Sequence, residues 1–293
     1  MTAAVIDATA GHVRRRRFSR LWRRFVARKP AVIGLVLSVA FVLVALFAPL
    51  IAPYEPDAGD FDALLQPPSA QHLMGTDDLG RDVFTRVVFG ARASIQAGVL
   101  AMALAMIVAV PIGIVSGYYR GWLDSAVGRL VDTMLSFPFV VLAVGLAAIL
   151  GPSLTNASIA LGVAQVPSIV RITRGETLSI REEDFIAGAV ADGASDPVIL
   201  ARHVLPNIMN PLLVQATVVI PQAIIGESVL SFLGLGVQPP TPSWGVMLSQ
   251  AQPYLTDALW LAIFPGLAIF LATLSFNLLG DGMRDVLDPK SLT

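Results

Sequence analysis

The side chains that most often carry chemistry are few and widely separated in this sequence. It has no cysteine, which excludes disulfides, thiolate metal sites and thiol nucleophiles. Apolar stretches long enough to cross a membrane separate His72 from His12 and His203, so the three histidines cannot share a metal ion. The lysines, Lys29 and Lys290, each adjoin a proline, so no phosphate-binding loop ending in Gly-Lys-Ser/Thr exists. We therefore expect no catalytic residue, no metal site and no cofactor in this chain, and any ATP that drives it must be hydrolysed in another subunit.

One carboxylate lies inside a stretch that is otherwise suited to a membrane. Glu227 is followed by Ser228 and Ser231, which have the spacing of a helix contact with Gly234. A charge at mid-membrane costs about 3 kcal/mol on insertion scales, so such a residue faces a partner helix or a cavity. Two interpretations stay open, a structural hydrogen-bonded role at a helix contact and a place on a translocation path.

A polar segment at residues 184–207 interrupts the apolar sequence, with Gly193 in its middle. Ser179 and Glu182 have the spacing of a capping box, which predicts a helix that begins near Ile180. Gly193 is the residue type that ends helices in the left-handed conformation, so we expect this helix to end there. The segment has the composition of a loop that docks another protein.

A second short helix is predicted after the glycine. Asp196 followed by Pro197 is typical of a helix N-terminus, and Pro206 would stop the helix. A helix, a turn and a helix also resemble a DNA-reading motif, but a tether between two membrane spans argues against nucleic acid. Small residues surround the bend and permit close approach of another backbone: Ala187, Gly188, Ala189, Ala191, Gly193 and Ala194.

The composition requires a membrane around these features. Hydrophobic residues make up 55% of the chain, charged residues 14%, and the mean hydropathy is +0.72, which no single water-soluble core of this length could bury. A span needs about 20 mainly apolar residues. The fold class is therefore an all-α polytopic membrane protein of about six transmembrane helices, in the windows 31–51, 94–116, 130–150, 157–170, 211–235 and 258–279.

Basic residues predict the orientation. They crowd the segment before the first window, which would keep the N-terminus inside the cell and also contact anionic lipid. We expect a basic cytoplasmic segment at 1–30, a first span at 31–51, an extracytoplasmic loop at 52–92, a five-helix core at 93–285 with a cytoplasmic loop at 171–210, and a cytoplasmic tail at 286–293. Both ends are then inside. The basic residues are Arg14, Arg15, Arg16, Arg17, Arg20, Arg23, Arg24, Arg28 and Lys29.

The outer loop contains a charged, glycine-rich turn, G-T-D-D-L-G-R-D. Its side chains Asp77, Asp78, Arg81 and Asp82 could contact a binding protein or satisfy one another and the backbone. We favour a structural outer loop that also forms part of a docking surface.

The polar segment resembles the EAA loop of ABC-importer permeases, whose pattern is E-A-A, three residues, Gly, nine residues and I-x-L-P. Here the order is Ala187-Gly188-Ala189, then Gly193, then His203-Val204-Leu205-Pro206, with matching spacing but without the Glu, the central Ala and the Ile. The residues that the resemblance assigns to ATPase coupling, with their neighbours, are Asp184, Ala187, Gly188, Ala189, Asp192, Gly193, Ala194, His203, Leu205 and Pro206.

Two further segments narrow the resemblance to C-type permease subunits of dipeptide, oligopeptide and nickel importers. They are residues 72–82, HLMGTDDLGRD, and residues 226–245, GESVLSFLGLGVQPPTPSWG. Together with the loop they extend the resemblance over nearly all of residues 30 to 290.

The resemblance implies a type I ABC importer permease in a bacterial cytoplasmic membrane. Its expected partners are a homologous second permease in a heterodimer, two ATPase subunits that bind ATP and Mg²⁺, and an extracytoplasmic peptide-binding protein. The implied cargo is dipeptides or short oligopeptides, and nickel or another small solute is the alternative. An ion-coupled secondary transporter is a more distant one, because Glu227 has no partner acid at similar depth.

Overall fold

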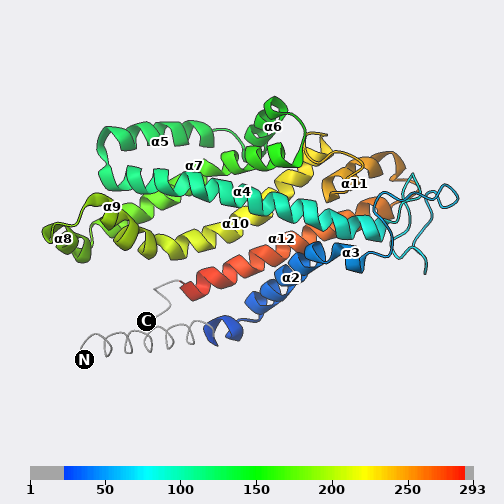
Figure 1. The fold of residues 1–293 in the computed structure, drawn as a ribbon, viewed down its shortest axis with the longest axis horizontal. Coiled ribbons are helices and arrows are strands. Elements are labelled where there is room, and N and C mark those ends of the chain that lie inside the picture. The colour runs from blue at the N-terminus through cyan, green and yellow to red at the C-terminus, as the bar shows by residue number, and fades with distance from the viewer. Residues whose placement is uncertain (1–22, 288–293) are drawn as a thin grey trace.

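The computed structural model describes residues 23–287, so most of the basic N-terminal segment and Lys290 of the tail lie outside the described part. Within that part the protein is helical and its strand structure is limited to an isolated bridge between Thr76 and Asp82 (Figure 1). The helices are α2 (Lys29–Leu46), α3 (Ala48–Ile51), α4 (Val83–Tyr119), α5 (Gly121–Leu135), α6 (Phe139–Leu150), α7 (Leu154–Arg181), α8 (Asp184–Ala191), α9 (Asp196–Ile199), α10 (Leu205–Phe232), α11 (Trp244–Ala251) and α12 (Trp260–Leu287). A π-helical turn (Leu200–Val204) joins α9 to α10, and a 3-10 turn (Gln252–Tyr254) follows α11.

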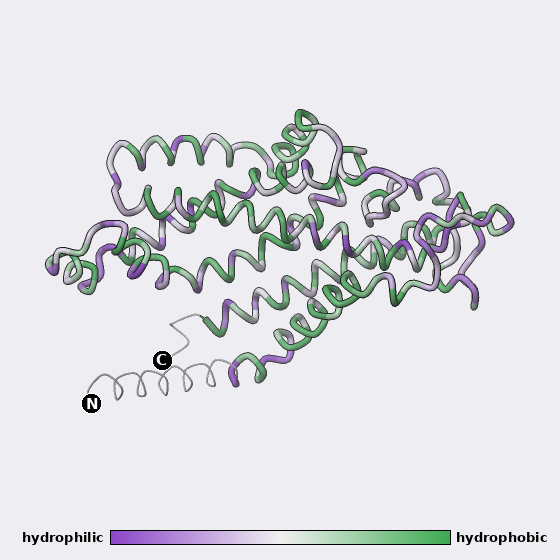
Figure 2. The backbone as a smooth tube through the Cα atoms, in the orientation of Figure 1, coloured by the Kyte–Doolittle hydropathy of each residue, from purple (hydrophilic) through white to green (hydrophobic). Residues whose placement is uncertain are grey.

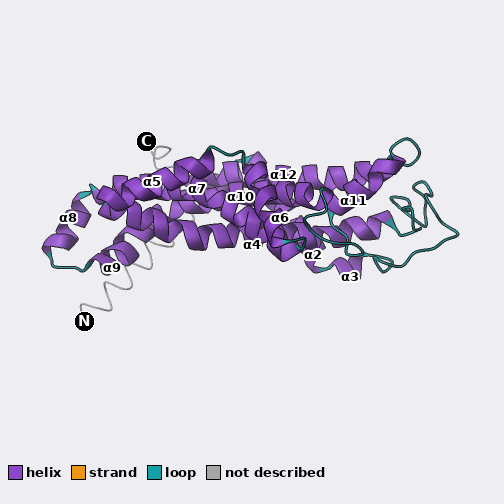
Figure 3. Ribbon diagram, turned by 90° about the horizontal axis from the view of Figure 1, so that it is seen from above, coloured by secondary structure: helices purple, strands orange, loops and turns teal. Residues whose placement is uncertain are grey.

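The long helices α4, α7, α10 and α12 run along one axis and form an elongated bundle, with α2 beside α12 (Figures 1 and 3). Helices α8 and α9 project from one end, and the loop before α4 lies with α11 at the opposite end. Hydrophilic residues concentrate in these terminal loops (Figure 2). Arg28 pairs with Asp285, so the start of α2 and the end of α12 lie on one side of the bundle, toward α8.

Four described helices, α2, α4, the continuous α9–α10 segment and α12, are long and apolar enough to cross a membrane, and the bent pair α5–α6 makes up to five. Two expected spans differ in detail. The window 130–150 is broken, because α5 and α6 meet at 92° around residues 136–138, where Pro138 cannot continue a helix ladder. The window 157–170 lies in α7. This helix is long enough to cross a membrane, but it carries too many polar residues to count among the apolar spans.

Two helix boundaries also shift. The first span ends at Leu46, and Pro49 lies in the separate short helix α3. Helix α4 begins at Val83, within the stretch expected to be loop, because the Asp82 carboxylate caps it by accepting a hydrogen bond from the Thr85 amide at 2.8 Å.

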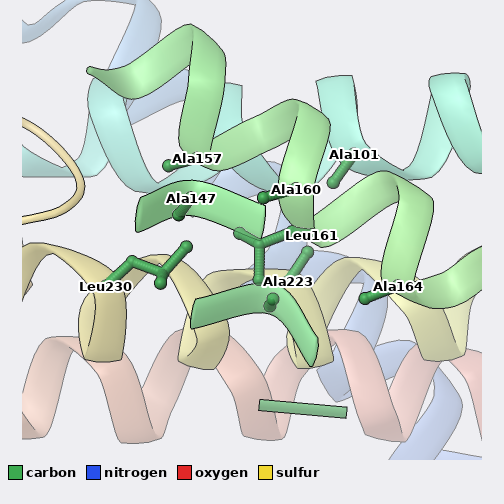
Figure 4. Packing of buried hydrophobic residues seen from close by; sticks show 9 residues of the cluster. Ala101, Ala147, Ala157, Ala160, Leu161, Ala164, Ala223 and Leu230 are labelled. Atoms are coloured by element: carbon green, nitrogen blue, oxygen red, sulfur yellow. The ribbon is translucent and has the colours of Figure 1, made fainter. Parts of the chain in front are cut away.

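Small residues allow the helices to approach closely. Between α4 and α7, a Cβ added to Gly113 would lie 2.6 Å from the Cβ of Thr173. Between α2 and α12, a Cβ on Gly34 would lie 2.5 Å from the backbone nitrogen of Leu279. A cluster of alanines around Leu161 joins α4, α6, α7 and α10 (Figure 4). Membrane helices associate through such close van der Waals packing, so these contacts define the bundle.

Candidate functional site

Helix α8 is the first element of the polar loop. It begins at Asp184 rather than near Ile180, because α7 continues to Arg181 and therefore contains Ser179; the capping-box prediction is wrong. Its end matches the expectation. Gly193 has φ +79°, its amide donates to the Val190 carbonyl, and the Ala194 amide donates to the Ala189 carbonyl, each at 3.0 Å. These two hydrogen bonds form a Schellman motif, which requires the left-handed residue.

The second helix differs from its prediction at both ends. Ser195, not Asp196, is the N-cap residue of α9, and Pro206 does not stop the helix. The chain instead passes through the π-helical turn, where the Leu205 amide donates to the Leu200 carbonyl. The wider turn suits a following proline, which has no amide hydrogen to contribute to an α-helical ladder. Helix α9 is thus continuous with α10 through the π-helical turn.

Apolar and polar contacts attach the loop to the bundle. Ile186 of α8 and Ile199 of α9 are buried with Ile208 of α10 and Ile114 of α4. The Tyr118 hydroxyl at the end of α4 donates to the Asp196 carboxylate at 3.2 Å. Through Ile186, α8 thus shares one buried cluster with α4, α9 and α10.

The outer face of α8 has no cover within the described chain. Phe185 and Val190 are 44% and 56% exposed. Asp184, Ala187, Gly188, Asp192 and Gly193 are also exposed, whereas Ala189, Ala194, His203 and Leu205 are half-buried and Pro206 is exposed. A Cβ added to Gly188 or Gly193 would meet nothing within 4 Å. The residues assigned to coupling by the resemblance thus lie on α8, in the turn after it, in the π-helical turn and at the start of α10. Of these elements, α8 has a buried side at Ile186 and an exposed apolar side at Phe185 and Val190.

Ion pairs connect the helices behind this loop. The Arg174 guanidinium of α7 binds the Asp124 carboxylate of α5 through two nitrogens, and one of these bonds is 2.6 Å long. Ser116 of α4 donates to the same carboxylate at 2.7 Å. Arg171 pairs with Asp132, again between α7 and α5. These contacts tie α4, α5 and α7 together at the end that carries α8.

Glu227 is fully buried at the other half of α10. Its carboxylate accepts hydrogen bonds from Ser94 of α4 at 2.9 Å and from Ser231 at 2.7 Å. Ser228 instead donates to the Ile224 carbonyl, and Gly245 of α11 packs against its backbone. Hydroxyl donors satisfy this carboxylate inside the subunit. The geometry supports the structural interpretation of Glu227 over the pore-lining one.

The charged turn of the outer loop is a compact network. The Arg81 Nε donates to the Asp77 Oδ2 at 2.7 Å, and the other Asp77 oxygen accepts the Leu79 and Arg81 amides. Asp82 caps α4 and bonds to the His72 Nδ1 at 3.0 Å. Asp77, Arg81 and Asp82 are buried, while the Asp78 side chain is 32% exposed. The structural half of our expectation matches this geometry; the docking half stays a prediction.

The structure also shows a polar site that the sequence did not predict. Gln165 of α7 is buried and its Nε2 donates to the Gln222 Oε1 of α10 at 2.7 Å, beside Ser168. Neutral amides carry no formal charge and belong to no metal-ligand pattern, so the charge and motif patterns of the sequence do not single them out. The low hydropathy of the 154–181 stretch was the signal that could have found them.

Comparisons with known proteins agree with this architecture. Residues 109–292 match the model of the family described as binding-protein-dependent transport system inner membrane component, and residues 17–68 match that of the N-terminal TM domain of oligopeptide transport permease C. The chain is 45% identical to the dipeptide transport system permease protein DppC of Alkalihalophilus pseudofirmus, over 92% of this chain and 88% of the relative. It is 44% identical to the glutathione transport system permease protein GsiD of Escherichia coli, over 92% and 89%.

Solved structures extend the comparison to the fold. An inward-facing structure of the MetNI methionine ABC transporter superposes with a TM-score of 0.57 over 69% of this chain and 96% of the solved chain, at 21% identity. The family implies ATPase subunits and a second permease as partners. The chain belongs to the family of binding-protein-dependent transport system inner membrane components and is a multi-pass permease subunit of an ABC importer of the bacterial cytoplasmic membrane.

Proposed function

We propose that this chain forms, with a homologous second permease, the path by which dipeptides or short oligopeptides enter the cytoplasm. A peptide-binding protein outside the membrane would deliver the cargo, and two ATPase subunits would supply the energy. The similarity to permeases named for dipeptide and glutathione transport supports this cargo class.

The observation that carries the proposal is the protruding α8. Its exposed Phe185 and Val190 form an apolar tip that a partner would bury, and its buried root at Ile186 and Ile199 joins α4 and α10. Closure of the ATPase subunits on ATP would push this tip. Because packed helices switch between discrete arrangements rather than bend continuously, the push would change the opening of the path.

Purification of the tagged chain from its native membrane in mild detergent tests this function. We expect a homologous permease and two ATPase subunits to copurify, and ATP hydrolysis to rise when peptide and the binding protein are added. Recovery of the chain without an ATPase would contradict the coupling role. Stimulation by Ni²⁺ and not by peptide would replace the cargo with nickel.

A further inference from the structure

Residues around the bend between α5 and α6 line a cavity. The bend lies away from α8 and α9 (Figure 1). Its volume is about 320 Å³, which falls at the lower end of the roughly 300–1,000 Å³ typical of small-ligand sites. Apolar residues of the bend, including Phe137 and Phe139, form most of the lining, and its polar residues are Gln165, Ser168 and Gln222. The lining contains no charged side chain, no imidazole and no thiol.

The two glutamines form the polar centre of the cavity. Gln165 is 3% exposed and donates to Gln222, whereas Gln222 is exposed on the open side. A side-chain amide has two donor hydrogens and an oxygen with two lone pairs. Their mutual bond uses one donor of Gln165 and one lone pair of Gln222. The pair therefore keeps both donor and acceptor capacity toward a molecule in the cavity.

The polarity of α7 extends this surface along the bundle. A second cavity of about 390 Å³ lies between α5 and α7, and its lining includes Asp132, Arg171 and Arg174. Polar side chains at membrane depth face protein or water rather than lipid tails. The α5–α7 face thus continues from the neutral amide pair toward the charged end that carries α8.

We propose that the cavity at the α5–α6 bend is a substrate contact in which Gln165 and Gln222 bind the main-chain amide of a passing peptide. The inference rests on the proposed peptide cargo and assigns a site to it. A peptide bond offers one N–H and one C=O, which match the donor and acceptor of a glutamine amide. Every peptide carries this group, so the contact is independent of sequence, and the apolar lining accommodates varied side chains.

The strength of the contact suits transport. A neutral hydrogen bond shifts a binding equilibrium only about 2–10-fold net, so two such bonds orient the peptide and still allow its release. The lining offers a free metal cation neither carboxylate nor imidazole ligands. The site therefore selects for amides over the nickel alternative.

Uptake of dialanine by the complete transporter tests the site. We expect Gln165→Leu and Gln222→Leu each to lower the uptake rate below saturating dialanine about 3–10-fold, the equivalent of one hydrogen bond, with ATPase assembly retained. The matched control is Gln215→Leu, the same change on the same helix outside the cavity lining, which should keep the wild-type rate. Equal rates in Gln222→Leu and wild type would overturn the site. No dialanine uptake by the wild type would instead overturn the proposed function.

Cysteine labelling supplies a readout that does not depend on transport rate. The chain has no cysteine, so Gln222→Cys and Gln215→Cys each place a lone thiol in it. We expect a water-soluble thiol reagent to label Gln222→Cys, and dialanine during turnover to slow that labelling but not labelling at position 215, as followed on this chain by mass spectrometry. Absence of labelling, or labelling by lipid-soluble reagents only, would show that lipid or the second permease covers the cavity. Labelling indifferent to dialanine would equally reject the inference.

Discussion

Gly188 and Gly193 offer a matched pair of substitutions in the loop that we propose couples to the ATPase subunits. Neither position has an atom within 4 Å of an added Cβ, so replacement by alanine changes backbone energetics and not packing. Gly188 lies inside α8 with a helical backbone, whereas Gly193 has φ +79°. Alanine at position 188 also restores the family's central Ala, so an ATPase surface should accept it.

The two substitutions change the stability of α8 in opposite directions. Alanine in a helix interior is favoured over glycine by about 1 kcal/mol, so Gly188→Ala stabilises α8. A left-handed residue with a Cβ costs about 1–2 kcal/mol, so Gly193→Ala weakens the Schellman motif that ends the helix. That loss reduces the ratio of ordered to frayed loop about 5–30-fold. Gly193→Asn should lie between alanine and wild type, because asparagine tolerates this conformation better.

Hydrogen exchange and coupling together provide the assay. In the purified transporter we expect amides of residues 184–194 to exchange about 5–30-fold faster in Gly193→Ala and no faster than wild type in Gly188→Ala. Uptake per ATP hydrolysed should fall only in Gly193→Ala. The same behaviour in both variants would refute the backbone argument. Faster exchange with unchanged uptake per ATP hydrolysed in Gly193→Ala would show that coupling does not depend on an ordered loop.

Three further predictions concern the bundle. Glu227→Leu leaves buried hydroxyls without an acceptor and should lower the free energy of unfolding by about 1–3 kcal/mol. Glu227→Gln keeps an acceptor and should transport within about twofold of the wild-type rate. A Glu227→Gln variant that does not transport but has normal thermal stability would mean that the charge is essential. Gly34→Ala forces α2 away from α12 and should lower the free energy of unfolding in detergent by about 1–3 kcal/mol. The control Gly145→Ala has free space around its Cβ and should leave the free energy of unfolding unchanged. Equal melting temperatures for the two variants would disprove the close contact. A double-mutant cycle on Asp124 and Arg174 should give an interaction energy of about 1 kcal/mol. This energy should decrease in 1 M salt, because the Arg174 side chain is 38% exposed to solvent. An interaction energy that does not change with salt would indicate an ion pair inaccessible to solvent.

The failed local predictions share a cause. The capping box at Ser179 and the stop at Pro206 are rules for isolated helix ends, and both positions lie instead within longer elements. Around Ile199 and Ile208, burial of apolar side chains against α4 stabilises the fold more than ending a helix would. A π-helical turn accommodates the proline that follows it. Local propensity is a weak prior where tertiary packing competes.

Composition, hydropathy and glycine positions are local properties of the chain, so the sequence alone determined the membrane class, the position of the polar loop and the left-handed end of α8 at Gly193. Tertiary structure decided which side chains meet. The hydroxyl donors around Glu227 come from Ser94 and Ser231, and the amide pair joins Gln165 to Gln222 across two helices. Such pairings depend on helix rotation and on the α5–α6 bend, which result from packing over the whole bundle and leave no periodic signal in the sequence.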